Sequence, residues 1–259
     1  MAWYSSRVSP CEYDAEADFV VRSVPSGQVF GVNRTRLEEG SSVFRDMFSC
    51  CDSGYVVSEL DQDARMLDLD ESAEHLSLLF HLLHAPPEPH SPPKVPKGSN
   101  HDFHDKVFHI QQTLPPDTVI PFPLIPTLLT LADKYALSDA ILHVLHTHLA
   151  AYTSTHSLRV YGYAVSLGLE TVAARASTYL LDPPLSSHTA QDISVIPNAE
   201  AYHRLVQLHA YRIKKLTTYL MGEEIFPHGY GKCPRHSAQT QEVWEDRKKV
   251  VCAKIQAGK

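Results

Sequence analysis

The chain has 259 residues, of which 43% are hydrophobic, so it can bury a substantial core in one or two domains. Its net charge of −7 at pH 7 argues against a general nucleic-acid binder. No apolar run approaches the roughly eighteen residues of a transmembrane helix. The N-terminal stretch MAWYSSRVSP lacks the charged start and apolar core of a signal peptide.

The cysteines and the missing catalytic motifs narrow the functional classes further. Five cysteines without a CxxC pair fit reduced thiols in the cytosol or the nucleus better than a disulfide framework. The sequence has no GxSxG motif, no phosphate-binding glycine loop and no HExxH motif. No spacing of serine, histidine and aspartate singles out a triad, so we expect neither an enzyme nor a bound cofactor.

The chain begins with an expected flexible lead over residues 1–17, followed by a predicted β-hairpin. Asp18–Ser23 (DFVVRS) has the composition of a strand, and Gln28–Val32 (QVFGV) that of the returning strand. Pro25–Gly27 between them is typical of a turn.

The next elements are two short helices, a strand and a longer helix. Arg34–Glu39 and Ser42–Phe48 are the short helices, and Met66–Leu69 is the predicted strand. Ala73–His84 carries leucines and a phenylalanine on one face, which predicts a buried stripe. Ser72 precedes this helix and is a suitable N-cap.

A proline- and histidine-rich segment, residues 85–118, interrupts this pattern. Six prolines lie within Pro86–Pro96, and proline fixes φ and removes a backbone donor, so the segment is predicted to be an insertion outside any helix or sheet. A loose group of possible metal ligands follows, which we interpret as a solvated polar loop: His101, Asp102, His104, Asp105 and His109. Val119–Ile120 is predicted to resume the fold as a short strand.

A predicted helical hairpin follows the insertion. Ile125–Leu137 (IPTLLTLADKYAL) has apolar residues at steps of three and four, with Pro126 in its first turn. A break at Ser138–Asp139 opens a second amphipathic run that ends near Tyr152.

The sequences of four stretches resemble those of the BTB/POZ domain family. DFVVRS is similar to the first strand of that family, and VFGVNRTRLEEGSSVFRDMF to its second strand and first helical pair. MLDLDESAEHLSLLFHLLH is similar to the third strand and the helix after it, and LLTLADKYAL to a later helix with an Ala-Asp-Lys-Tyr signature. The resemblance covers residues 18–152 apart from the insertion at 85–118. It implies an α+β fold, a short sheet packed on helical hairpins. Asn33 departs from the family, which usually has a histidine there.

The resemblance implies a protein–protein interaction module that self-associates or recruits partners as an adaptor or co-regulator. In dimers of the family, an aspartate at the first strand and a basic residue after the second line a charged pocket at the interface. Asp18 and Arg34 occupy these positions. The family also includes adaptors of cullin-type ubiquitin ligases, but here the insertion replaces a connection that usually faces the cullin, which argues against cullin binding.

An all-α extension is predicted over residues 153–221 from periodicity. Ser157 is the expected cap of a helix over Leu158–Leu167 that Gly168 ends. A second helix is expected over Leu169–Leu181, and a long helix from Pro197–Asn198 to about Met221.

Residues 222–259 form a basic tail, for which two interpretations remain open. Four residues are candidate zinc ligands, of which Cys233 and His236 have a suitable spacing: His228, Cys233, His236 and Cys252. A zinc-stabilised basic tail would suit a nuclear DNA-associated regulator, which is the alternative function. The other interpretation is a solvated helix whose apolar face (Val243, Trp244, Val251 and Ile255) docks on the protein or on a partner.

Overall fold

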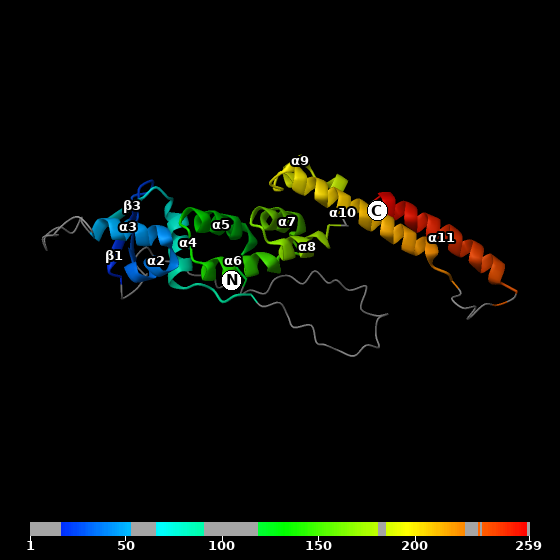
Figure 1. The fold of residues 1–259 in the computed structure, drawn as a ribbon, viewed down its shortest axis with the longest axis horizontal. Helices are drawn as coiled ribbons and strands as arrows, with labels where there is room; N and C mark the ends of the chain where they lie inside the picture. The colour runs from blue at the N-terminus through cyan, green and yellow to red at the C-terminus, as the bar shows by residue number, and fades with distance from the viewer. Residues whose placement is uncertain are drawn as a thin grey trace. The chain divides into compact units, whose positions relative to one another are not determined.

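The computed structural model describes residues 17–52, 66–90, 119–180, 185–225, 233 and 235–257. The chain divides into two compact units, Met1–Tyr152 and Thr153–Lys259 (Figure 1). Most of the expected N-terminal lead and of the Pro/His-rich insertion, including its histidine cluster, lies outside the described residues.

The described part of the first unit is a small mixed sheet followed by helices. Its elements are β1 (Phe19–Ser23), β2 (Val29–Val32), α2 (Arg34–Gly40), α3 (Ser42–Asp52), β3 (Met66–Leu69), α4 (Ala73–His84), the 3₁₀ turn η2 (Phe122–Leu124), α5 (Ile125–Lys134) and α6 (Asp139–Ala151). The strand order is β2-β1-β3, with β2 antiparallel and β3 parallel to β1. The predicted α+β class is therefore confirmed.

The β1–β2 hairpin closes as its sequence predicts. Gly27 has a φ of 69°, the left-handed conformation that glycine adopts without a steric penalty. Its N–H donates to the carbonyl of Ser23, and the Ser23 N–H donates to the carbonyl of Gln28. In the sheet, Val21 lies opposite Phe30 on one side and Leu67 on the other. Val21 and Phe30 are buried, so this register directs the apolar side chains to the core.

Helix α4 lies between the two helical pairs, because it packs against both α2 and α5 (Figure 1). Its Ser72 cap is confirmed, since the side chain accepts a hydrogen bond from the His75 N–H. The helices share one core, which includes these fully buried side chains: Leu37, Phe44, Leu76, Leu79, Phe80, Ile125, Leu128, Leu145 and Leu149.

The α2–α3 junction and the α5–α6 junction are bonded to each other. Ser41 forms a β-bridge with Leu137, and its Oγ donates to the carbonyl of Tyr135 at 2.5 Å. The Tyr135 ring stacks on Phe44, with the centroids 5.1 Å apart and the planes 8° from parallel. Burial, together with the charges of Glu71 and Asp70, raises the pKa of Tyr135 to about 12, so its phenol stays neutral.

Two predictions for this unit are wrong in detail. Val119–Ile120 is not a strand, because the Ile120 N–H and carbonyl bond to the side chains of His148 and Tyr152 instead of to a neighbouring strand. Helix α5 ends at Lys134 and not at Leu137, because the chain turns at Ala136, whose φ is 43°.

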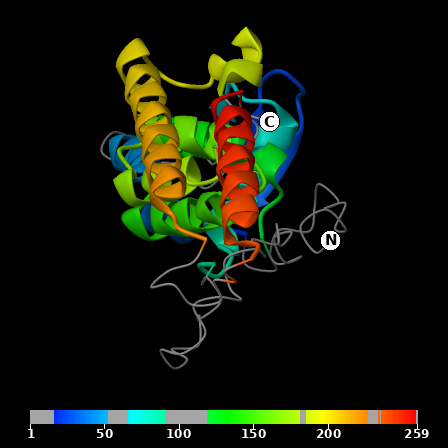
Figure 2. The same cartoon turned by 90° about the vertical axis from the view of Figure 1, so that its right-hand side faces the viewer.

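The regular elements in the described part of the second unit are all helices or 3₁₀ turns. It contains α7 (Ser157–Ser166), α8 (Glu170–Ser177), the 3₁₀ turn η3 (Leu185–Ser187), α9 (Ala190–Ile193), α10 (Ala199–Gly222) and α11 (Ser237–Ala257). Figures 1 and 2 show α10 and α11 running side by side. None of the helices in the described ranges combines the length and the hydropathy that a membrane span requires.

The predicted helix caps and ends of this unit agree with the structure in part. Gly168, with a φ of 69°, ends α7 as expected. Asn198 caps α10, since its side chain accepts a hydrogen bond from the Ala201 N–H. Ser157 is not the cap of α7, because it is the first helical residue, and His156 occupies the cap position without a side-chain bond to the helix backbone. Helix α8 is shorter than predicted and ends at Ser177.

Candidate functional site

The structure brings Asp18 and Arg34 together through the backbone of Arg34. Asp18 immediately precedes β1, and its Oδ1 accepts a 2.8 Å hydrogen bond from the Arg34 N–H, in the first turn of α2. A carboxylate at a helix N-terminus satisfies an otherwise unpaired N–H and complements the positive end of the helix dipole. Asp18 therefore helps to define where α2 begins.

The side chain of Arg34 has partners of its own. Its Nε donates to Glu38 Oε1 at 2.7 Å, one helical turn further along α2. Its Cζ lies 4.8 Å from the centroid of the Phe48 ring, within the range of a cation–π contact. About a third of each side chain of the Arg34–Glu38 pair remains exposed, so the charged surface is accessible and yet fixed in place.

His84 on α4 binds the backbone directly before Arg34. The Asn33 N–H donates to His84 Nε2 at 3.0 Å, and His84 Nδ1 lies 2.9 Å from the carbonyl of Phe80. The network assigns the ring proton to Nδ1, since Nε2 must accept. The side chain of Asn33 caps α2 by accepting from the Arg36 N–H. Asn33 is therefore well suited to its position, and an asparagine directly before a helical run is the signal in the sequence for this role.

Aromatic side chains connect this surface to the core. The Phe19 ring contacts the Phe48 ring edge to face, with the centroids 4.9 Å apart. Phe48 stacks on Phe44, which stacks on Tyr135. Phe44 and Phe48 are almost completely buried, whereas Phe19 is only half-buried. We call Asp18, Phe19, Arg34 and Glu38 the N-terminal surface.

A second feature that the sequence did not indicate lies at the two ends of the insertion. His148 on α6 is 1% exposed, and its Nδ1 accepts a 3.1 Å hydrogen bond from the Ile120 N–H. Its Nε2 lies 3.0 Å from the carbonyl of Glu88, to which it must donate. Burial lowers the pKa of His148, although the bond to Glu88 opposes this effect, and the neutral ring suits both roles.

Neighbouring side chains reinforce these bonds. The His90 N–H donates to Thr147 Oγ1, and the Tyr152 hydroxyl donates to the carbonyl of Ile120. We call His148, Glu88 and Ile120 the histidine clamp. The clamp joins the chain before the insertion to the chain after it.

The three predicted zinc ligands that the structure describes do not come together. Cys233 Sγ and His236 Nδ1 lie 3.6 Å apart, but Cys252 is buried near the far end of α11, about 22 Å further along a helix with a rise of 1.5 Å per residue. His228 lies outside the described residues. Among the residues that the structure describes, no three His, Cys, Asp or Glu side chains are grouped to hold a metal ion.

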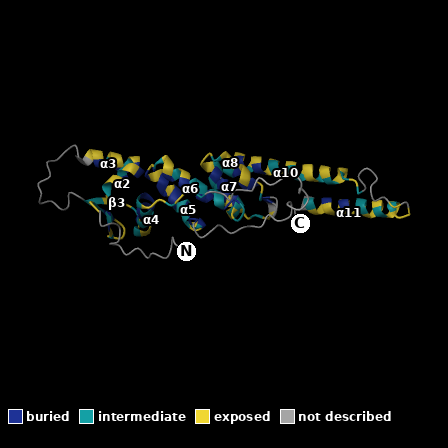
Figure 3. Ribbon diagram, turned by 90° about the horizontal axis from the view of Figure 1, so that it is seen from below, coloured by how far each residue is buried: buried dark blue, intermediate teal, exposed yellow. Residues whose placement is uncertain are grey.

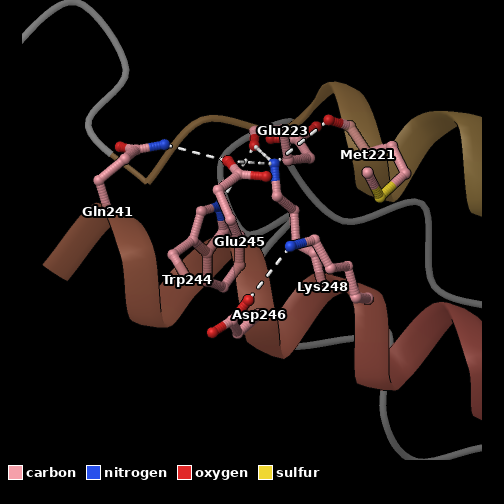
Figure 4. A network of polar contacts seen from close by, with 8 residues as sticks. Met221, Glu223, Gln241, Trp244, Glu245, Asp246 and Lys248 are labelled. Atoms are coloured by element: carbon pink, nitrogen blue, oxygen red, sulfur yellow. Dashed lines mark hydrogen bonds and ion pairs between the residues drawn. The ribbon is translucent and has the colours of Figure 1, made fainter. Parts of the chain in front are cut away.

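One basic residue of the tail, Lys248, has its bonding partners within the chain. Lys248 is 4% exposed, and its Nζ donates to the carbonyls of Met221 and Glu223 at the end of α10 (Figure 4). The indole N–H of Trp244 donates to the same Glu223 carbonyl. The Nζ of Lys248 also pairs with Glu245, which lowers the pKa of that carboxyl. The tail is thus a helix attached to α10, and of its predicted apolar face Val243 and Val251 remain exposed.

A scan of protein-family models found no match to this sequence, and a search of curated proteins found none with significant similarity. The geometry described above is therefore the basis for any functional conclusion.

Proposed function

We propose that the chain is a non-enzymatic protein–protein interaction module whose first unit is of the BTB/POZ type. Support comes from the two motifs that carry the resemblance, SSVFRDMF and LADKY, because they are in direct contact. Ser41 is bonded to the carbonyl of Tyr135, and the Phe44 ring stacks on the Tyr135 ring. The order of elements also agrees with that resemblance: hairpin, helix pair, third strand, long helix and helix pair.

We further propose that a second copy of the chain docks on the N-terminal surface. The observation that carries this proposal is the fixed arrangement of Asp18, Arg34 and Glu38 beside a half-buried aromatic ring. Charged groups held in place at a partly apolar surface select a complementary partner and orient it, because less side-chain entropy is lost on binding. The module would act in the cytosol or the nucleus, as an adaptor or a co-regulator.

Sedimentation velocity over a concentration series tests self-association. Asp18→Asn keeps an oxygen that can accept the Arg34 N–H but removes the charge, and Arg34→Gln removes the guanidinium from Glu38 and Phe48. We expect each variant to weaken the dimer about tenfold or more, since a loss of about 1.4 kcal/mol corresponds to a factor of ten.

Arg22→Gln is the matched control, because Arg22 pairs with Asp68 in an exposed position on the sheet. It should dimerise as the wild type does. A wild type that stays monomeric at the highest concentration would refute self-association, and unchanged dimerisation of both test variants would refute this surface as the interface.

The alternative function, DNA association through a zinc-stabilised tail, has less support. Cys252 is far from Cys233 and His236, and Lys248 is buried at the end of α10. A cullin-type partner also has less support, since the insertion separates α4 from α5 in the sequence.

A further inference from the structure

The two ring nitrogens of His148 bond to the two ends of the insertion in opposite senses. Nδ1 accepts from the Ile120 N–H, on the chain after the insertion. Nε2 donates to the carbonyl of Glu88, within the described start of the insertion, residues 85–90. Figure 3 shows buried and exposed residues on α6, and His148 belongs to the buried ones. A neutral ring with its proton on Nε2 is the form that makes both bonds.

Protonation of the ring affects these two bonds differently. An imidazolium ion has an N–H on each nitrogen and accepts no hydrogen bond, so Nδ1 would direct its N–H against the N–H of Ile120. The bond from Nε2 to the Glu88 carbonyl would remain and would strengthen, because its donor would then be charged. A single proton would thus break one bond of the histidine clamp and keep the other.

The groups around the ring do not stabilise a charge on it. The His90 ring, whose centroid is 6.3 Å from that of His148, would repel this charge when it is itself protonated. The Glu88 side chain is exposed, and the Tyr152 hydroxyl donates to the carbonyl of Ile120. Residues 119–124 have no ionisable side chain. Burial lowers the pKa of His148, and His90 acts in the same direction, against the bond to Glu88.

Helices α5 and α6 supply no counter-charge to the ring either. Their other ionisable residues are Asp133, Lys134, Asp139, His143 and His146. Lys134 pairs with Glu71. Asp139 is in the first turn of α6, about 13 Å along the helix from His148. Since no carboxylate is among the described hydrogen-bond partners of the His148 ring, a proton there would lack an anionic partner.

We propose that His148 is a proton-sensitive switch that, on acidification, releases the chain after the insertion from α6 while the start of the insertion stays attached. In the open state the Ile120 N–H leaves Nδ1, and water reaches the ring. This inference concerns attachment within the first unit. It does not depend on the proposed self-association, so the two can fail separately.

The uptake of one proton on opening determines the size of the effect. The ring is neutral in the closed state, whereas in the open state it binds a proton with its ordinary pKa of 6.5. Above pH 6.5 the open fraction is therefore independent of pH. As the pH falls from there toward the lowered pKa of the closed state, the open fraction rises by at most about tenfold per pH unit.

Amide hydrogen exchange of the full chain, followed by NMR and expressed as protection factors, tests the switch. The Ile120 N–H reports the bond that breaks, and the His90 N–H, which donates to Thr147 Oγ1, reports the start of the insertion. The N–H of Leu79, in the middle of α4, reports global unfolding. We expect Ile120 to be less protected than Leu79 at every pH.

Between about pH 7.5 and about pH 5.5, the protection factor of Ile120 should fall severalfold, and at most about tenfold. The protection factor of His90 should fall less. The nitrogen chemical shifts of the His148 ring should place its proton on Nε2 at the higher pH.

Two variants identify the group that takes up the proton. In His148→Gln an amide can accept from Ile120 and donate to Glu88 but cannot be protonated, so the pH dependence at Ile120 should disappear. His90→Gln is the matched control, because it removes the ionisable ring that faces His148. It should keep most of the fall at Ile120. Both variants should retain the wild-type circular dichroism spectrum.

Five results would overturn the proposal. In the wild type these are equal protection of Ile120 and Leu79, no fall at Ile120 on acidification, parallel falls at Ile120 and His90, or a ring proton on Nδ1 at the higher pH. The fifth is a fall at Ile120 that persists in His148→Gln or disappears in His90→Gln. The three wild-type amides decide the question even where a variant fails to fold.

Discussion

Replacement of His148 offers a quantitative test of the histidine clamp. His148→Leu keeps a similar volume but leaves the N–H of the fully buried Ile120 without a partner, which costs about 1–3 kcal/mol. Loss of the bond to the carbonyl of Glu88, an exposed residue, adds about 0.5–1.5 kcal/mol. A loss of a few kcal/mol should lower the Tm of the first unit by roughly 5–15 °C.

The stability of the clamp should also depend on pH in a defined direction. Because burial lowers the pKa of His148 below its ordinary value of 6.5, the unfolded chain takes up the proton before the folded chain does. The contribution of His148 is therefore complete above pH 6.5 and is lost as the pH falls from there toward the folded-state pKa. For one proton the slope is at most about 1.4 kcal/mol per pH unit.

His148→Gln isolates this titration, because an amide can accept from the Ile120 N–H and donate to the Glu88 carbonyl without taking up a proton. Other histidines with lowered pKa values, His81, His146 and His156, act in the same direction and cancel in the difference between wild type and variant. His90, whose ring centroid is 6.3 Å from that of His148, is present in both.

Urea denaturation followed by circular dichroism at about pH 7.5 and pH 5.5 provides the free energies of unfolding. We expect the wild type to lose more stability than His148→Gln on acidification. Equal losses would show that His148 does not titrate as its burial requires. A His148→Leu variant as stable as the wild type would refute the clamp itself.

Four further substitutions test the packing. Gly40→Ala should destabilise the fold by about 1–3 kcal/mol, since a Cβ at Gly40 would lie 2.3 Å from Leu83 Cδ2. Gly222→Ala should instead stabilise the fold by about 0.5–1 kcal/mol, because a Cβ at Gly222 would have no atom within 4 Å. Urea midpoints measure both effects. Leu128→Ala should cost about 2–5 kcal/mol because Leu128 is fully buried, and a midpoint equal to that of the wild type would contradict its place in the core. Lys248→Met should leave the carbonyls at the end of α10 without their donor and speed up amide hydrogen exchange in α11; unchanged exchange would contradict this role.

Local patterns predicted the elements whose boundaries depend on local chemistry. The bounds of β3 and α4 match the prediction, because strand composition, Ser72 and a regular apolar stripe are all signals within a few residues of one another. The end of α5 depends on the bond between its following turn and the α2–α3 junction, about 94 residues earlier in the chain. Periodicity within one helix contains no information about such a contact.

The same distinction applies to the candidate site. The pair Arg34 and Glu38 is separated by four residues on a predicted helix, so its ion pair was accessible from the sequence. The role of Asp18 as a partner of the Arg34 N–H and not of its guanidinium required the structure. His148 bonds to residues 28 and 60 positions away, and a histidine on an apolar helix face does not reveal such partners in advance.

The buried Lys248 also restricts how α11 aligns along α10. Two antiparallel helices held together mainly by weak apolar contacts can slide past each other by whole turns at little cost. The ammonium group removes that freedom, because free carbonyls occur only where α10 ends, at Met221 and Glu223. A slipped pairing would leave the buried ammonium group with only Glu245 of its own helix as a partner and without the carbonyls of α10. One lysine therefore sets a single register for the hairpin.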